Sequence, residues 1–430
     1  MITYHIKLAI HSVTSKLTYS ILLSLAISIG VSVCVVLLNA HSHMVRDPIP
    51  NKSSQLYHVQ LDSWGQGKAI DSPNKIPEKL TYLDANTLLD FNDNIVKTAI
   101  ARTYAVIDKE EIGKPFSISI RANTSDLFEM FSVPFKYGKS WSQDSDKQGH
   151  NEIILTTKTN FRMFDGRNSV GEKIWVNSKL FKVVAVIDNW NPIPNFLNLS
   201  SNPFGSKIGA YIPFNTLTVN ELPRSGNIKC LESLSGGNYR DFLTSECVWI
   251  DFWVYLKNKE EFKAYKIFLD SYINGQKELN RFKRPTLSKI LDVNEWIKIQ
   301  KITGDEFESI IVLAFMILLL CIVNSSSLLF HNFSSQKEHS KIRYYLGSSK
   351  KLIFLQYIVE AIIIGLIGGL IGLFLSILGT YGIELLYDKE LSNISNMNLY
   401  QFILAISFAV LATVIAAILP AYNVAKTCMK

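Results

Sequence analysis

Apolar residues gather along this chain in four long stretches, separated by one long mixed region and two short polar segments. Three of the stretches contain no charged residue, and the other is interrupted only by Glu360 and Glu384. Each reaches the roughly 20 residues that an α-helix needs to cross about 30 Å of hydrocarbon. The sequence therefore predicts four membrane-spanning helices, at residues 17–40, 309–330, 352–386 and 401–420.

The first stretch has a second interpretation, a cleavable signal peptide, because Lys7 and Lys16 precede its apolar core. That core is longer than the roughly 7 to 15 residues usual in such peptides. The sequence that follows it, AHSHMVRD, has no clear small-residue cleavage site. We therefore favour a membrane helix that the mature protein keeps.

The long region between the first two membrane helices, residues 41–290, alternates between two kinds of pattern. Runs such as PFSISIRA, NEIILTT and CVWIDFWVYLKN are rich in β-branched and aromatic residues, as strands are. The run KEEFKAYKIFLDSYINGQ instead has the spacing of an amphipathic helix. Because strands and helices are interleaved, the region is predicted to form a large α+β domain.

The segment before the second membrane helix, residues 291–308, repeats apolar side chains at Val293, Trp296, Ile299 and Ile302. Such spacing is typical of an amphipathic helix. We predict a stalk helix that continues upward from the membrane, with an ordinary helix of the domain as the alternative.

Lysine and arginine are unevenly divided among the short segments outside the membrane helices. Segment 331–351 carries five of them, and residues 1–16 and 421–430 carry two each, whereas segment 387–400 carries only Lys389. By the positive-inside rule, both termini and segment 331–351 are cytoplasmic. The α+β domain and the short segment 387–400 then lie outside.

Composition agrees with a membrane protein that has a soluble part, since 48% of the 430 residues are hydrophobic. Much of the net charge of +7 lies at the cytoplasmic helix ends, so nucleic acid is not an expected partner. Of five cysteines, only Cys230 and Cys247 lie in the external domain. An oxidising compartment allows them to form a disulfide, with two separate buried thiols as the alternative.

Catalytic motifs are absent from the sequence. It lacks the GxxxxGK[ST] phosphate-binding loop, the HExxH zinc motif and the GxSxG nucleophile turn. His41 and His43 lie close together, but such a pair near a membrane surface is more often solvated than bound to a metal. We expect no catalytic residue, metal site or cofactor in this chain, and an enzyme with an external active site is the third-ranked alternative.

Residues 365–372 read GLIGGLIG and contain two overlapping pairs of glycines four positions apart. Glycines at this spacing on an apolar helix leave a flat strip that another helix backbone can approach closely. We predict a tight helix contact here, either within the chain or across a dimer. The glycines expected in this contact are Gly365, Gly368, Gly369 and Gly372.

Two polar side chains lie inside predicted membrane helices. Glu360 lies about 12 Å along the helix from Leu352. Its carboxylate either bonds to a neighbouring helix or proton site, or lies near the cytoplasmic headgroups because the helix enters hydrocarbon only near Tyr357; we favour the second. Asn324, which begins an Asn-Ser-Ser-Ser run, is expected to form hydrogen bonds between helices.

The segment KEHSKIRYYLGSSKKLIFLQYIVEA resembles a signature of MacB/FtsX-like ABC transporter permeases. In that superfamily, Glu-Ile-Gly-Ile-Arg-x-Ala-Leu-Gly-Ala-Ser follows the second membrane helix, and an Ile and a Glu-Ala pair open the third. In the external domain, FEMFSVPFKYGKSW and FKVVAVID also resemble the family's core domain. The matching residues of the signature are Ile342, Arg343, Leu346, Gly347, Ser349, Ile353, Glu360 and Ala361.

A short cytoplasmic helix over about residues 335–346 would carry three apolar side chains on one face, with basic side chains available for polar contacts. The resemblance implies that this is a coupling helix, seated in a groove of a separate ATPase. A basic amphipathic loop on anionic lipid is the alternative, and the two are compatible. The residues expected in the contact are Lys341, Ile342, Arg343, Tyr345, Leu346 and Gly347.

The resemblance also implies an assembly and a function. A four-helix permease of the bacterial inner membrane would present a MacB-like α+β periplasmic core domain. ATP and Mg²⁺ would bind a partner P-loop ATPase, and a second permease chain, identical or homologous, would complete the complex. The expected work is tripartite efflux of a peptide or small molecule through a periplasmic adaptor and an outer-membrane channel. Lipoprotein extraction, control of a cell-wall hydrolase, and a membrane sensor or receptor are the alternatives.

Overall fold

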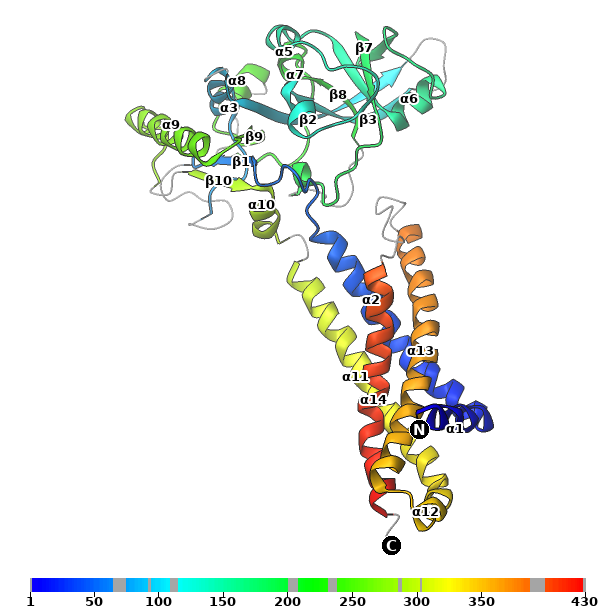
Figure 1. Cartoon of the computed structure of the whole chain (residues 1–430). Coiled ribbons are helices and arrows are strands. Elements are labelled where there is room, and N and C mark those ends of the chain that lie inside the picture. The colour runs from blue at the N-terminus through cyan, green and yellow to red at the C-terminus, as the bar shows by residue number, and fades with distance from the viewer. Residues whose placement is uncertain are drawn as a thin grey trace. The chain divides into compact units, whose positions relative to one another are not determined.

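The computed structural model divides the chain into two compact units, one helical and one built on a β-sheet (Figure 1). The helical unit comprises Met1–Val45 and Thr303–Lys430, and the sheet unit comprises Arg46–Ile302. The predicted loop over 387–400 lies almost wholly outside the residues that the structure describes. The described residues are 2–64, 75–91, 94–108, 115–199, 208–230, 238–284, 288–301, 304–386 and 399–427.

Four helices of the helical unit are long and apolar enough to cross a membrane. They are α2 (Leu17–Met44), α11 (Gly304–Ser335), α13 (Lys350–Leu386) and α14 (Leu399–Thr427). α13 lies against α2 and α14, and α11 also contacts both of these helices. The four helices therefore form one bundle.

Two shorter helices lie toward one end of this bundle (Figure 1). α1 (Ile2–Ser15) precedes α2, and α12 (Lys337–Tyr345) connects α11 to α13. Residues 1–16, expected only as a cytoplasmic terminal segment, thus contain a helix. Ala9 and Val13, four positions apart, are buried and mark the inner face of α1.

Ten strands form one mixed sheet in the other unit. They are β1 (Leu56–Leu61), β2 (Val96–Asp108), β3 (Phe116–Asn123), β4 (Phe135–Gly138), β5 (Glu152–Thr156), β6 (Lys173–Val176), β7 (Lys179–Ile187), β8 (Ile208–Pro213), β9 (Asp251–Tyr255) and β10 (Ser288–Asp292). The strands β2, β3, β8, β5, β7 and β6 close into a ring, because β6 pairs with both β7 and β2. β9, β1 and β10 continue the sheet beyond β2.

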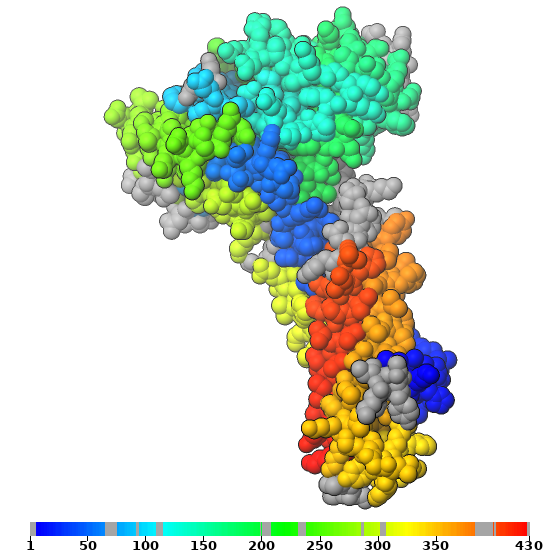
Figure 2. Space-filling view, viewed as in Figure 1, coloured from blue at the N-terminus to red at the C-terminus, as the bar shows by residue number. Residues whose placement is uncertain are grey.

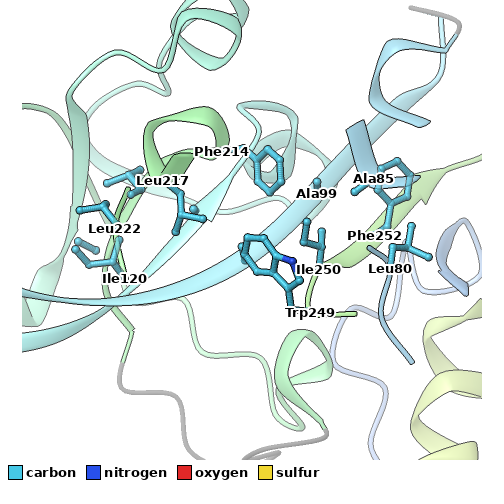
Figure 3. Close-up of a cluster of buried hydrophobic side chains, with 14 of the residues drawn as sticks. Leu80, Ala85, Ala99, Ile120, Phe214, Leu217, Leu222, Trp249, Ile250 and Phe252 are labelled. Atoms are coloured by element: carbon cyan, nitrogen blue, oxygen red, sulfur yellow. The ribbon is translucent and has the colours of Figure 1, made fainter. Parts of the chain in front are cut away.

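Each face of the sheet carries its own apolar core. Along β2, Ala99 and Ala101 enter one core and Ile100 enters the other, as the alternation of side chains along a strand requires. In the second core, Phe131 packs edge-on against Trp253 of β9. Figure 3 shows part of the first core, with Leu80, Ala85, Ala99, Ile120, Phe214, Leu217, Leu222, Trp249, Ile250 and Phe252.

Helices connect the strands of this unit, and several begin at a capping side chain. The Asn258 side chain, for example, accepts hydrogen bonds from the backbone N–H groups of Glu260 and Glu261. The prediction of four membrane helices with an α+β domain between the first and second is confirmed. The helices of the sheet unit are α3 (Tyr82–Asp90), α4 (Asp126–Met130), α5 (Gln143–Gln148), α6 (Thr157–Phe164), η1 (Phe196–Asn198, a 3-10 helix), α7 (Phe214–Val219), α8 (Tyr239–Leu243), α9 (Lys259–Glu278) and α10 (Val293–Ile299).

The structure divides the predicted stalk helix over 291–308. The segment begins in β10, continues as α10, and resumes as α11 only at Gly304. Trp296 of α10 is buried, stacks on His58 with ring centroids 4.2 Å apart, and donates from Nε1 to the Phe196 carbonyl over 3.2 Å. Val293 and Trp296 therefore belong to the face that α10 buries within the sheet unit, as in an ordinary helix of the domain, whereas Ile299 is exposed and Ile302 lies outside the described residues. Lys301, at φ +44°, follows the end of α10.

A disulfide joins Cys230 to Cys247. The backbones beside it pair in an isolated antiparallel bridge between Lys229 and Val248, which brings the two cysteines to a Cα–Cα distance of 4.3 Å. The structure therefore shows the predicted disulfide and not the alternative, in which Cys230 and Cys247 remain two separate thiols.

A buried carboxylate lies in the short helix α5. Asp146 accepts hydrogen bonds from Nε1 of Trp141 and from the backbone N–H of Ser125, each over 2.6 Å. Burial raises the pKa of Asp146 to about 6, although these two donors act in the opposite direction. Folding therefore favours the protonated form of this side chain.

We expect the stability of the sheet unit to fall as the pH rises through this pKa. An acid whose pKa is raised on folding stabilises the fold fully below its ordinary value of 3.8 and loses that contribution as the pH passes about 6. The shift corresponds to at most about 3 kcal/mol. Thermal unfolding of the full chain in detergent, from about pH 4 to about pH 7, should show the fall for the native chain.

The decrease in stability with rising pH should be lost in Asp146→Asn. It should be kept in Asp144→Asn, which changes an exposed neighbour on α5. A pH profile that is the same in both variants would contradict this assignment.

Candidate functional site

Helix α12 ends at a glycine-dependent cap. Gly347 has φ +103°, a conformation that residues with a Cβ rarely adopt. Its N–H donates to the Tyr344 carbonyl and that of Ser348 donates to the Arg343 carbonyl, each over 3.0 Å. These two bonds form a Schellman motif, so Gly347 ends α12 and turns the chain toward α13.

The inner face of α12 is tied to α13 by two side-chain hydrogen bonds. The hydroxyls of Ser340 and Tyr357 lie 2.8 Å apart, and Nη1 of Arg343 donates to Oε1 of Gln356 over 2.6 Å. Tyr344 packs against the apolar cluster that includes Tyr357. Arg343, which we expected to be available for polar contact, bonds α13 through one of its nitrogens, and its part in a contact with an ATPase stays a prediction.

The outer face of α12, which we define as Ile342, Tyr345 and Leu346, points away from the bundle. Their exposed fractions are 57%, 80% and 81%. Figure 2 shows the yellow segment that contains α12 at the surface of the helical unit. Lys341 lies beside this face, with Nζ 3.4 Å from Oε1 of Glu338. Three adjoining apolar side chains exposed on a short helix are suited to an apolar groove on another protein.

Glu360 of α13 is buried in the bundle, with only 1% of its surface exposed. Its Oε1 accepts a hydrogen bond from Nδ2 of Asn332 on α11 over 3.3 Å. The structure shows the bond to a neighbouring helix that was the first interpretation, and the favoured position near the lipid headgroups stays a prediction. A partner amide offsets part of the cost of burying this polar group.

The N-terminal segment joins the same polar cluster. Nζ of Lys16, between α1 and α2, donates to the Asn332 carbonyl over 3.4 Å and also bonds the Ser335 hydroxyl. Nε2 of Gln336 donates to the Ser12 hydroxyl over 3.0 Å. The cluster therefore links α1, α2, α11 and α13 next to the point where α12 leaves the bundle.

The glycine strip of α13 faces two different helices. A Cβ at Gly368 or Gly372 would lie 3.2 or 3.3 Å from a carbonyl oxygen of α2, at Ser24 or Ser28. Gly365 and Gly369 instead face α14. The tight contact that the sequence predicted therefore lies within the chain, with α13 wedged between α2 and α14.

Asn324 lies on the exposed side of α11. Within the described part of the chain, no hydrogen bond joins its amide to another helix. Ser325 is buried, and the Ser327 hydroxyl donates to the Val323 carbonyl of its own helix over 3.5 Å. The interhelical bond expected of Asn324 is therefore not formed inside this bundle.

Sequence patterns did not identify Ser340, Tyr357 or Gln356 as the residues that orient α12. Hydrogen bonds between side chains of different helices leave no local pattern in the sequence. The polar Ser340, however, lies on the opposite side of a helix from the apolar Ile342, and this placement could have indicated the inner face. No group of three or more His, Cys, Asp or Glu residues that could hold a metal ion occurs in the described ranges.

Substitution of Gly365 should destabilise the bundle. In Gly365→Val, the new Cβ would lie 2.9 Å from Cα of Val410 and 3.2 Å from the Ala409 carbonyl, and both are backbone atoms of α14. Overpacking of this kind costs about 1–3 kcal/mol. The midpoint of thermal unfolding in detergent should fall, whereas Gly382→Val should leave it nearly unchanged because nothing lies within 4 Å of that position. Equal midpoints for the two variants would refute this packing.

Two family models match the chain, one in each unit. The MacB-like periplasmic core domain matches residues 20–260, and the FtsX-like permease C-terminal domain matches residues 311–428. Together they cover the first membrane helix, most of the sheet unit and the last three membrane helices.

Curated relatives are similar at low identity. The macrolide export ATP-binding/permease protein MacB of Campylobacter jejuni is 22% identical over an alignment of 433 positions, which covers 98% of this chain and 59% of that protein. MacB of Acinetobacter baylyi is 19% identical over 60% of this chain and 34% of its own length. The chain thus spans less than two thirds of either relative. The uncharacterized ABC transporter permease YknZ of Bacillus subtilis is 22% identical over 50% of this chain and 51% of its own length.

Among solved structures, the periplasmic region of MacB from Actinobacillus actinomycetemcomitans matches with a TM-score of 0.37 and 15% identity. The match covers 61% of this chain and 98% of that one. The periplasmic core model alone accounts for more than half of this sequence. The chain therefore belongs to the MacB/FtsX-like family of ABC transporter permeases.

Proposed function

We propose that this chain is a permease subunit that receives movement from a separate ATPase and relays it to its sheet unit. The observation that carries the proposal is the exposed outer face of α12. A groove on a cytoplasmic ATPase would bury Ile342, Tyr345 and Leu346, while the inner face holds α12 on α13. The absence of a phosphate-binding loop from this sequence favours ATP and Mg²⁺ in the partner.

Two routes lead from α12 to the sheet unit, one along the chain through α11 and one through hydrogen bonds to the start of α2. α12 follows α11 directly, and the polar cluster around Glu360 joins α11 and α13 to the start of α2. In chain order α2 leads to β1 and α11 follows α10 and β10. β1 and β10 pair antiparallel, from Tyr57 opposite Asp292 to Leu61 opposite Ser288. Movement of α2 or α11 would therefore reach two neighbouring strands of one sheet.

The location and cargo of the complex also belong to this proposal. A bacterial inner membrane, with both termini and α12 in the cytoplasm, agrees with the lysine and arginine of the short segments. Two permease chains, identical or homologous, would act with the ATPase. Efflux of a peptide or small molecule through a periplasmic adaptor and outer-membrane channel is our first choice, in keeping with the export named for the MacB relatives.

Replacing two apolar residues of α12 by acids should prevent ATPase recruitment. In Tyr345→Asp/Leu346→Asp, docking would bury two unpaired carboxylates, so we expect at least about a tenfold loss of the P-loop ATPase that co-purifies with the native chain. Both side chains are exposed in the free chain, and membrane insertion should be unaffected.

The matched control is Tyr345→Phe/Leu346→Met, which keeps the face apolar and should retain the ATPase. Undiminished co-purification with the acidic variant, or no P-loop ATPase with the native chain, would exclude this role for α12.

A further inference from the structure

A recess opens on the solvent-exposed side of the sheet unit, where β6 pairs antiparallel with both β2 and β7. Its volume is about 610 Å³, within the range of roughly 300–1,000 Å³ that is usual for ligand pockets. It lies apart from α12 and from the polar cluster around Glu360, which belong to the helical unit. The residues that line the recess are Val106, Asp108, Pro115, Trp175, Asn177 and Ser178.

The register of the strands brings a carboxylate beside an indole in this recess. Asp108 of β2 lies directly opposite Trp175 of β6, and Trp175 lies opposite Leu180 of β7. Side chains directly opposite each other have Cβ atoms about 4.5–5.5 Å apart. Val106, two residues before Asp108, is on the same side of β2 and is exposed, whereas Ile107 between them is buried in the first core. The exposed side of these strands is therefore apolar next to one acid.

The two polar groups of this pair are unused within the described part of the chain. There, Asp108 forms no ion pair or side-chain hydrogen bond, and the indole of Trp175 has no ring contact and no cation over it. Asp84 of the same unit is instead paired with Arg281 over 2.9 Å. Asp108 is half-buried, so its carboxylate has lost part of its contact with water without gaining a partner.

A carboxylate next to an indole favours a cationic ligand. An ammonium group donates up to three hydrogen bonds, and its bond to a carboxylate is strengthened by charge. A cation within about 6 Å of an indole ring is also attracted by its π-electrons. The carbon chain that carries the ammonium would pack on Val106 and Pro115. Lys173 and Lys182, opposite each other farther along the same side, would repel a second cation.

We propose that this recess binds a primary ammonium group attached to an apolar body, as in a lysine side chain within an apolar peptide. Asp108 accepts hydrogen bonds from the ammonium, and Trp175 covers the ammonium and the carbon chain that carries it. A small amphipathic amine offers the same chemistry, so the experiment compares both sources. The inference deepens the proposed function, on which it rests only for the role of the ligand as cargo.

Fluorine NMR tests binding at the recess itself, with the full chain in detergent and its tryptophans replaced by 5-fluorotryptophan. Trp175→Phe assigns the signal of Trp175. The peptide acetyl-Leu-Lys-Leu-amide should shift that signal in a saturable way, whereas acetyl-Leu-Gln-Leu-amide, which has no ammonium, should not. An equal shift with the two peptides would overturn the proposal.

The role of the carboxylate is tested by Asp108→Asn, which keeps the size of the side chain and removes its charge. The dissociation constant of the lysine peptide should rise at least about fivefold. The matched control is Asp144→Asn, which changes an exposed acid on α5 and should leave the constant unaltered. The signals of the other tryptophans report whether each variant keeps its fold. An unchanged constant in a folded Asp108→Asn variant would contradict the assignment.

Hexylamine carries the ammonium without a peptide backbone and therefore separates the two sources. A saturable shift with both probes supports recognition of the ammonium within a peptide, and a shift with hexylamine alone supports a small amine as the ligand. No response to either probe would overturn the proposal.

Co-purification of the P-loop ATPase is scored on the same variants. Asp108→Asn should retain the ATPase, because Asp108 lies in the sheet unit and α12 in the helical unit. Failure of the ammonium site and failure of the proposed function therefore give different results.

Discussion

The hydroxyl contact between Ser340 and Tyr357 fixes which side of α12 faces its own bundle and which side faces outward. With Ser340 and Arg343 bonded to α13, the helical phase leaves Ile342, Tyr345 and Leu346 exposed. The cap at Gly347 completes the arrangement by ending the helix before α13 begins. The proposed docking surface and the attachment to α13 thus lie on opposite sides of α12 and its C-cap residue.

Helix α13 occupies the centre of this attachment. It carries α12 at one end, bonds to α11 through Glu360 and Asn332, and meets α2 and α14 at its glycines. Close-packed contacts have little room to deform, so under the proposed function a displacement of α12 would be passed on to the other helices of the bundle. A permease that is driven by a separate ATPase, as we propose, would benefit from both features of α13: glycines that pack closely against α2 and α14, and a buried polar cluster that joins it to α11.

Much of this architecture could be predicted from the sequence, because membrane helices are long, charge-free and separated by basic segments. The amphipathic phase of α12 likewise identified Ile342, Tyr345 and Leu346. Local patterns failed where tertiary contacts decide the outcome. Val293 and Trp296 have helical spacing, but both are buried in the sheet unit. The helix that contains them ends at Ile299 and does not continue to residue 308 as the predicted stalk would. Nor could spacing show that Glu360 meets Asn332, since that bond joins helices α13 and α11.

The central claim is that movement enters at α12 on one side of the membrane and is used by the sheet unit on the other. Labelling with a membrane-impermeant maleimide tests it most directly, in cells whose cytoplasmic membrane is intact and whose outer layers are permeable. With Cys34, Cys321 and Cys428 replaced by serine, Ile267→Cys on the exposed surface of α9 should react, and Leu346→Cys should react only after lysis. Equal labelling of both positions in intact cells would contradict the account.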